Sequence, residues 1–437
     1  MNYKQLLSEV IKFQSASTDA QYQDEIQKTV NWYKNIFETD GFKVNVITGY
    51  DNPIIIASYA ADPQYKTCLI YGHYDVQPAS KNEGWDNDPF TLTEKNGRLV
   101  ARGVIDNKGQ NLVHISTVIE LIKEKSLGYN VTFMIEGNEE TGSPHLETFI
   151  KDNQELLEAD FVMISDGEIS GGVPNIEVSF RGGFNSTLTV TVGTQDLHSG
   201  LYGSAAPNAI HELGKVIASL YDKENKVAVP GFYDDVLPVT QELLDNNKTI
   251  PYSTEEYKRI TGRHAMLSEQ GYDFYTQTGL RPAIEISGIQ AGYMGDGYRN
   301  AIPYKATAKI NFRLVKNQNA QTIIEKFKQQ VRSILPEYAD FVFETVGPYE
   351  GVVLDTNNPY VQKAKIILEL IWQKNAILKY NGGGLPIATY FDSILNIPQV
   401  LIPLANEDCN MHGANENFAV DYCEKGLAFS KRFLSKE

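Results

Sequence analysis

The sequence predicts an α/β fold that is interrupted by an inserted α+β domain, and three observations support this prediction. Strand-like and helix-like segments alternate over the first third of the 437-residue chain. Near residue 180 they give way to strands with one apolar and one polar face, and near residue 350 the first pattern returns. We therefore predict a discontinuous α/β domain over residues 1–180 and 350–437, with a second domain inserted over residues 181–349.

The α/β part begins with an apolar run over residues 67–73 (TCLIYGH), which is typical of a buried strand. Residues 107–125 then repeat apolar side chains at helical spacing, and Gly128 is a candidate stop signal for this helix. The alternation continues as a strand over 130–136, a helix over 145–157, a strand over 161–165, a helix over 358–374 and a strand over 399–404. This order predicts a mixed, mostly parallel sheet that is covered by helices on both faces.

The inserted domain is predicted from strands and helices in the order βαββαβ. Apolar residues alternate with polar ones over 186–193 and over 305–315, as in antiparallel strands with one solvated face. Two further strands and two amphipathic helices complete the set, at 283–290, 341–346, 208–221 and 320–335. The order matches the ferredoxin-like unit. The polar stretch 222–281 is predicted to be an insertion without an assigned shape.

The composition argues against several classes of partner. The formal net charge is -16, from 39 basic and 55 acidic residues. Nucleic acids and anionic membrane surfaces are therefore not expected as partners, because both are bound by clustered Lys and Arg. The cysteines show no CxxC spacing, the N-terminus is too polar for a signal peptide, and no stretch approaches the ~20 apolar residues of a membrane span. We expect a cytoplasmic protein.

Polar side chains stand at the ends of the predicted strands. His73 and Asp75 lie two residues apart at the end of the first strand and so share a face. Asp166 directly follows the strand over 161–165, a usual position for active-site residues in α/β sheets. Each also has a simpler interpretation, because surface histidines and turn aspartates are common.

Three more positions add to this group. The adjacent Glu139 and Glu140 follow the strand over 130–136, Asp106 precedes a helix, and His412 lies in a late loop. Taken singly, these residues indicate a solvated turn, a helix N-cap and an ordinary loop histidine. Together, two histidines and several carboxylates at one edge of a sheet suit two ions of zinc, manganese or cobalt that activate a shared water.

Six motifs give a more specific indication: "GHYDVQP", "RGVIDNKG", "EGNEETGS", "SDG", "DLHSG" and "MHGANE". In this order they resemble the motifs of the M20 metallopeptidases, a family of carnosinase-like dipeptidases, carboxypeptidase G-like enzymes and amino-acid deacylases. The resemblance covers nearly the whole chain. Residues 281–303 (RPAIEISGIQAGYMGDGYRNAIP) are most similar to the carnosinase-like branch.

The resemblance implies roles for the residues at the predicted sheet edge. Five of them match ligands of two divalent metal ions, most often zinc: Asp106 bridges the ions, His73 and Asp166 complete one site, and Glu140 and His412 complete the other. Glu139 matches the general base that takes a proton from the bridging water. Asp75 matches the aspartate that supports a ligating histidine.

The resemblance also assigns the inserted domain as a lid through which two chains form a homodimer. His198 matches a lid histidine that reaches the partner's site, although it could simply cap a loop. Asn300 and Arg313 match positions that bind substrate, and the fork of an arginine suits a carboxylate, although Arg313 could equally lie on a solvated strand face. Gly383 and Gly384 belong to a segment that holds the substrate, where backbone amides could bind an anion.

Two departures from the family pattern affect this site. Asn107 stands where relatives often carry an aspartate, and residues 380–386 read YNGGGLP where carnosinase-like relatives tend to read Arg-Glu-Gly-Gly-Ser-Ile-Pro. The second departure bears on dipeptide specificity, because this segment helps to hold the C-terminal end of the substrate.

We predict a metal-dependent hydrolase that cleaves an amide bond next to a free carboxylate, with a dipeptide as substrate. The alternatives within the family are an N-acyl amino acid deacylase and a carboxypeptidase. A phosphoesterase with the same metals should carry more basic residues near the ligands, where the sequence places only Arg102 and Lys108. An intact Glu139 argues against a non-catalytic peptide binder.

Overall fold

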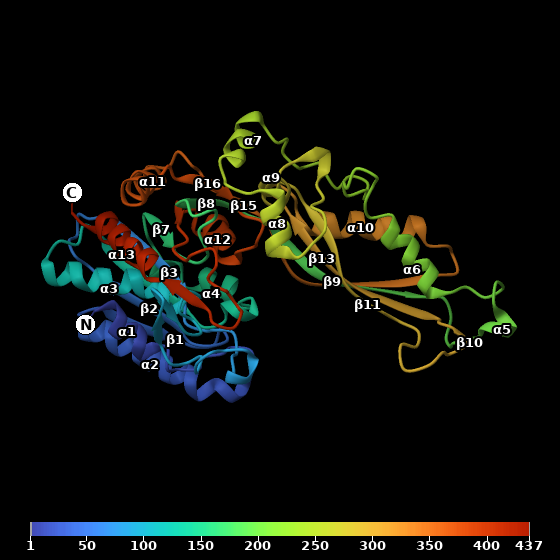
Figure 1. Ribbon diagram of the computed structural model, residues 1–437, viewed down its shortest axis with the longest axis horizontal. Helices are drawn as coiled ribbons and strands as arrows, with labels where there is room; N and C mark the ends of the chain where they lie inside the picture. The colour runs from blue at the N-terminus through green and yellow to red at the C-terminus, as the bar shows by residue number, and fades with distance from the viewer. Residues whose placement is uncertain (1, 437) are drawn as a thin grey trace.

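The computed structural model describes residues 2–436, without the side chain of Glu256. These residues form two lobes, each with its own sheet and its own hydrophobic core (Figure 1). The predicted fold class, an α/β part with an inserted α+β part, is confirmed. No helix among the described residues has the length and apolar character needed to span a membrane.

The large lobe contains a mixed sheet of nine strands. Its order is β1 (Lys43–Ile47), β2 (Ile54–Tyr59), β6 (Asn130–Glu136), β3 (Thr67–His73), β7 (Phe161–Ile164), β17 (Gln399–Leu401), β8 (Asn175–Phe180) and β15 (Val352–Val353), with β16 (Ile377–Tyr380) also paired to β8. The central strands β6, β3, β7 and β17 are parallel, and antiparallel pairs flank them.

Helices cover both faces of this sheet, because successive strand residues point to opposite sides. Cys68 and Ile70 of β3 join one core, whereas Leu69 and Tyr71 join another. The first core is covered by α1 (Tyr3–Val10), α2 (Gln23–Thr39), α3 (Lys108–Glu124), α11 (Pro359–Trp372) and α13 (Val420–Leu434). The second is covered by α4 (Leu146–Asp152) and α12 (Pro386–Tyr390).

The end of helix α3 differs from the sequence prediction. The helix ends at Glu124, and Lys125 adopts the left-handed conformation (φ 56°) that stops it. Gly128 instead packs against the last residues of the chain, and its amide donates to the carbonyl of Leu434 at 2.8 Å. Gly128 is therefore a packing residue and not the stop signal.

The small lobe is a four-stranded antiparallel sheet in the order β11 (Ala283–Ala291), β13 (Lys305–Leu314), β9 (Gly182–Thr191) and β14 (Asp340–Tyr349). Helices α6 (Ala209–Ala218) and α10 (Ala320–Ile334) pack on one face of it. This is the predicted βαββαβ unit. At its outer end, β10 (Leu197–His198) pairs with β12 (Ala301–Ile302), next to α5 (Ser199–Tyr202).

The stretch without an assigned shape forms three short helices, α7 (Gln241–Lys248), α8 (Thr254–Thr261) and α9 (Phe274–Leu280). They lie where the two lobes meet (Figure 1). The side-chain amide of Asn246 in α7 donates to the carbonyl of Leu378 in β16 at 2.7 Å. Strand β8 of the large sheet ends at Phe180 and β9 of the small sheet begins at Gly182, but the domain boundaries themselves stay a prediction.

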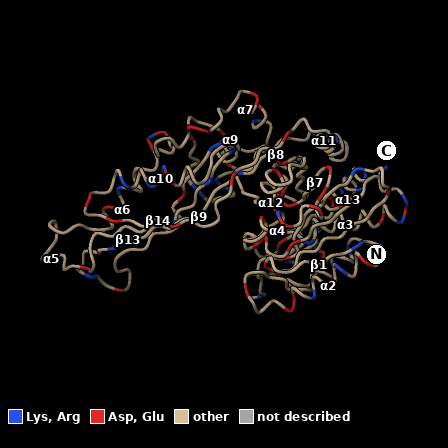
Figure 2. The backbone as a smooth tube through the Cα atoms, turned by 180° about the vertical axis from the view of Figure 1, so that it is seen from behind, with Lys and Arg blue, Asp and Glu red and all other residues tan. Residues whose placement is uncertain are grey.

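A separate sheet of three strands links distant parts of the large lobe: β4 (Thr93–Lys95), β5 (Arg98–Val100) and β18 (Asn417–Ala419). Antiparallel pairing of β5 with β18 brings the segment before α3 beside the loop that contains His412. Lysine and arginine residues are scattered over both lobes among acidic ones (Figure 2).

Candidate metal centre and active site

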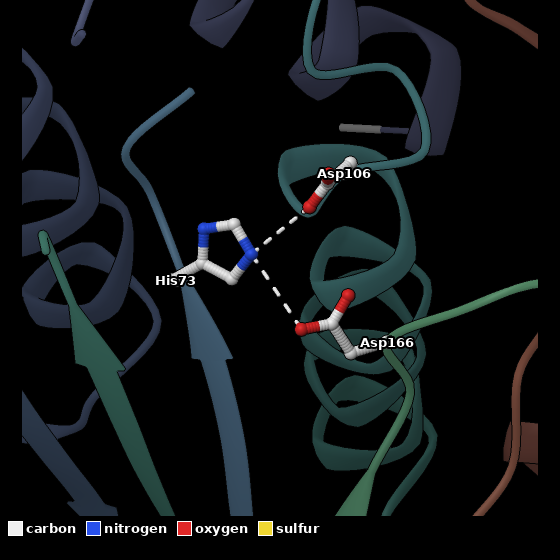
Figure 3. A group of neighbouring side chains, drawn as sticks. All are labelled: His73, Asp106 and Asp166. Carbon is white, nitrogen blue, oxygen red and sulfur yellow. Dashed lines mark ion pairs between the residues drawn. The ribbon is translucent and has the colours of Figure 1, made fainter. Parts of the chain in front are cut away.

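Two overlapping groups of side chains in the described part of the chain can each hold a metal ion. They are His73, Asp106 and Asp166, and Asp106, Glu140 and His412, with the ligand atoms in each group within 4.8 Å of one another. Nε2 of His73 lies 3.1 Å from Oδ1 of Asp106 and 3.6 Å from Oδ2 of Asp166 (Figure 3). Nε2 of His412 lies 2.8 Å from Oδ2 of Asp106 and 3.3 Å from Oε2 of Glu140. The two oxygens of Asp106 thus face different groups.

Parallel strands explain why these residues meet. His73 ends β3 and stands in register with Glu136, the last residue of β6. β7 pairs with β3 on its other side, so Asp166 emerges at the same edge of the sheet. The carboxyl ends of parallel strands share one edge, which is where α/β proteins place their active sites.

Asp75 joins the His73 strand to the glutamate turn. Its carboxylate accepts hydrogen bonds from the backbone amides of Glu139 and Glu140, at 3.2 and 3.1 Å, and from the hydroxyl of Ser17 at 2.7 Å. Its Oδ1 also lies 3.3 Å from Nδ1 of His73. These contacts hold the ring of His73 and the turn that presents both glutamates, and the supporting role that the resemblance gives to Asp75 stays a prediction.

Glu139 lies in the 3₁₀ turn Glu139–Thr141, close to the two groups. Burial raises the pKa of its carboxyl well above the usual range; His73 opposes this rise, and the negative charges of Asp166, Asp106 and Asp75 add to it. A carboxylate of raised pKa beside a cluster of ligand-type residues is suited to accept and return a proton.

Asn107 carries a side-chain amide where relatives often carry a carboxylate, and this amide forms a hydrogen bond within the site. Its Nδ2 donates a 2.8 Å hydrogen bond to the carbonyl of Ser165, the residue before Asp166. A carboxylate could not donate this bond. The amide of Asn107 therefore holds the segment of Asp106 against the segment of Asp166 through an uncharged hydrogen bond.

A buried ion pair that the sequence did not indicate holds two loops of the site together. The Glu416 carboxylate accepts from Nη1 of Arg102 at 2.6 Å and from the backbone amides of Gly103, Ile105 and Asp106 at 3.0, 2.9 and 3.3 Å. Arg102 also donates to the carbonyl of His412 at 3.3 Å. The pair therefore fixes Asp106 and His412 relative to each other.

Arg102→Ala is expected to lower the free energy of unfolding by about 3–5 kcal/mol, because it leaves the buried Glu416 carboxylate without its cation. Denaturant unfolding of the variant and the parent at equal metal concentration measures this. Arg98→Ala is the matched control, since its partner Asp408 is 69% exposed and such pairs contribute about 0–1 kcal/mol. Equal losses in the two variants would contradict the role given to Arg102.

The donor set fits divalent cations. Nε2 of His73 is buried and has no hydrogen-bond partner in the described residues, although two carboxylates face it. Hydrogen bonds to Asp106 and Glu140 raise the pKa of His412 to about 10, so these carboxylates favour positive charge at that point. Burial opposes ionisation of Asp106, but the hydrogen bond from His412 and the positive charge of the nearby His73 prevail and lower its pKa. Imidazole nitrogens with carboxylate oxygens are ligands of zinc, manganese and cobalt.

His198 and Asn300 lie together in the small lobe but away from this cluster. His198 is in β10 at the outer end of the small lobe (Figure 1), and its Nδ1 accepts from the amide of Gly200 at 3.0 Å. The carbonyl of Asn300 accepts from the amide of Ser199 at 3.1 Å. Within one chain, the structure does not bring these two residues to the groups of His73 and His412.

Arg313, Gly383 and Gly384 lie at the junction of the lobes. Arg313 is near the end of β13, opposite Gly183 of β9. The amide of Gly383 donates to the side chain of Asn381 at 2.9 Å, so it is already used within the chain. Gly384 packs closely against the hydroxyl of Tyr349.

An α/β sheet with histidines and carboxylates grouped around a shared aspartate is the arrangement of a metallopeptidase. Comparison with known proteins gives the family: residues 69–436 match the model of peptidase family M20/M25/M40, and the chain belongs to this family.

Three relatives illustrate the similarity. The chain is 30% identical over 391 residues to the Beta-Ala-His dipeptidase of Homo sapiens, which covers 87% of this chain and 77% of the relative. It is 28% identical over 440 residues to the Cys-Gly metallodipeptidase of Schizosaccharomyces pombe, with coverage of 96% and 92%. The crystal structure of an M20 family metallo-carboxypeptidase from Sulfolobus solfataricus superposes with a TM-score of 0.87 at 29% identity, over 99% of this chain and 98% of the other.

Proposed function

We propose that the protein is a metal-dependent dipeptidase that cleaves an amide bond next to a free carboxylate. The observation that carries the proposal is the pair of ligand groups joined through Asp106, with the partly buried Glu139 beside them. The Beta-Ala-His and Cys-Gly dipeptidases among the relatives support the choice of a dipeptide.

His73, Asp106 and Asp166 would hold one ion, and Asp106, Glu140 and His412 the other. The ions are divalent, with zinc, manganese and cobalt as candidates. Such a pair would supply Lewis-acid chemistry, which would lower the pKa of a bound water molecule and polarise the carbonyl of the scissile amide.

The residues of the chain supply the other parts of the reaction. Glu139 accepts the proton of the attacking water and returns it to the leaving amine, which requires a carboxyl group that both gains and loses a proton. Asp75 keeps Glu139 and His73 in place through the contacts described above. Arg313 pairs with the carboxylate of the substrate, and Gly383 and Gly384 line the segment against which the substrate lies.

The test is an assay of the purified, metal-loaded protein against dipeptides, N-acyl amino acids and longer peptides. Faster hydrolysis of dipeptides with a free amino group supports the proposal. A preference for N-acylated substrates or for longer peptides would replace it with a deacylase or a carboxypeptidase. The carboxypeptidase deserves a place in the panel because the Sulfolobus solfataricus enzyme is similar over nearly the entire chain.

We also propose a homodimer formed through the lid. Several large apolar residues at the outer end of the lid are exposed: Leu201, Tyr202, Met294 and Tyr298. Exposed apolar groups gathered in one region favour a protein contact, and two-fold dimers are the commonest oligomers. In such a dimer, His198 and Asn300 would lie against the partner's site. We further propose a cytoplasmic location, and the net charge of -16 argues against a nucleic-acid or anionic-membrane partner.

His198→Ala is expected to keep the metals and lower turnover by about 10²–10³, the usual cost of losing one oxyanion donor. A heterodimer of His198→Ala and Glu139→Gln subunits, isolated with two different tags, should regain turnover, because one of its sites receives both an intact Glu139 and an intact His198. The homodimers of each variant are the controls. An inactive heterodimer, or a monomer in light scattering, would overturn this arrangement.

A further inference from the structure

A glycine separates two polar residues in the lid sheet, near the junction with the large lobe. Strand β9 lies between β13 and β14, and Gly183 of β9 is opposite Arg313 on one side and Tyr349 on the other. Side chains opposite each other in neighbouring strands point to the same face. A Cβ at Gly183 would collide with the carbonyl oxygen of Phe312, so no side chain fits there. Arg313 and Tyr349 can therefore meet across β9.

The phenol of Tyr349 connects Arg313 with the large lobe. Burial raises the pKa of Tyr349, whereas the charges of Arg313 and Arg181 and a hydrogen bond from Arg313 oppose the rise. The Tyr349 hydroxyl also packs against Gly384. The charge of Glu139 acts on the same phenol, which places it near the proposed general base.

Arg181 brings a second guanidinium to this place. Its Nε donates to the carbonyl of Gly382 at 2.7 Å and its Nη1 to the carbonyl of Arg281 at 3.1 Å. Burial, and then the charge of Arg313, lower the pKa of Arg181 to about 10. Neither Arg181 nor Arg313 forms an ion pair with a carboxylate in the described residues. Two neighbouring guanidiniums that lack an acidic partner create a local positive charge. This charge favours the binding of an anion.

We propose that Tyr349 positions the guanidinium of Arg313 to receive the C-terminal carboxylate of the substrate, and that Arg181 supplies a second positive charge there. This inference rests on the proposed function, since it names residues that recognise the carboxylate. The hydroxyl of Tyr349 restricts Arg313 to one geometry. Because the contact with Gly384 ties Tyr349 to the large lobe, the recognition site includes residues of both lobes.

The test compares a good dipeptide substrate with its C-terminal amide, which has the same peptide but lacks the charge. Tyr349→Phe removes only the hydroxyl and should raise KM for the dipeptide about ten-fold, with kcat within about two-fold and little change for the amide. In an Arg313→Ala background the same substitution should add less than about two-fold, because its target is gone. Tyr338→Phe is the matched control, since the hydroxyl of this lid tyrosine donates to Glu212.

Circular dichroism and metal content establish that each variant is folded and loaded. An unchanged KM for the dipeptide in Tyr349→Phe, an equal loss on dipeptide and amide, or additive effects of the two substitutions would overturn the role of Tyr349. A parent enzyme that hydrolyses the amide as well as the dipeptide would instead refute carboxylate recognition in the proposed function. The two failures are therefore distinct.

Discussion

Glu139→Gln is expected to abolish turnover while the protein keeps its fold and its metals. The amide of glutamine has nearly the shape of the carboxylate but cannot accept the proton of the attacking water, and loss of a general base typically costs about 10²–10⁴ in rate. The effect should appear in kcat, because the substitution leaves Arg313 and the rest of the substrate contacts unchanged. Steady-state kinetics and elemental analysis of the same preparation measure both parts of this expectation.

Glu140→Gln is the matched control, with the same substitution at the neighbouring residue. Oε2 of Glu140 lies 3.3 Å from Nε2 of His412, so this variant should lose affinity for metal and recover turnover when metal is added in excess. The two results separate the roles of adjacent residues. If Glu139→Gln lost metal and Glu140→Gln kept it, the roles would be reversed.

Removal of metal is expected to abolish activity completely. Dialysis against a chelator should take turnover to the background rate, and zinc, manganese or cobalt should restore it after the chelator is removed. The ion that restores the highest kcat at the lowest concentration identifies the preferred metal. Turnover in protein that elemental analysis finds free of metal would refute the two-metal proposal.

Metal affinity should fall as the pH falls, because protons compete for the imidazole nitrogens and carboxylate oxygens that bind the ions. Titration of activity with metal at a mildly acidic and a neutral pH measures this shift. An affinity that does not depend on pH would be inconsistent with His73 and His412 as ligands.

The sequence predicted the parts of the structure that depend on local patterns. The strand over 67–73 and the βαββαβ order could be recognised because apolar residues recur at the spacing of each element. The approach of His73 to Asp166 followed from the rule that parallel strands share a carboxyl edge. The roles of these residues come from the family resemblance and stay predictions.

Contacts between distant segments could not be predicted in this way. Arg102 and Glu416 are separated by 314 positions, and only the folded chain shows that they form one ion pair. The positions of Arg313 and Tyr349 on either side of Gly183 depend on strand register, which includes an irregularity between Val346 and Tyr349. Lys125 ends helix α3 in the left-handed conformation, which glycine adopts most easily. The preference of glycine for this conformation therefore did not locate the end of the helix.

The link between Arg102 and Glu416 also has a consequence for biosynthesis. The ribosome synthesises the chain from its N-terminus. Most residues of the centre therefore leave the ribosome long before the loop of His412, namely His73, Asp106, the two glutamates and Asp166. Until Glu416 arrives, Arg102 and the Asp106 loop lack the carboxylate that accepts their hydrogen bonds. The complete centre therefore forms only after Glu416 has been synthesised, and a nascent chain that stops before residue 412 can present at most the group of His73, Asp106 and Asp166 to a metal ion.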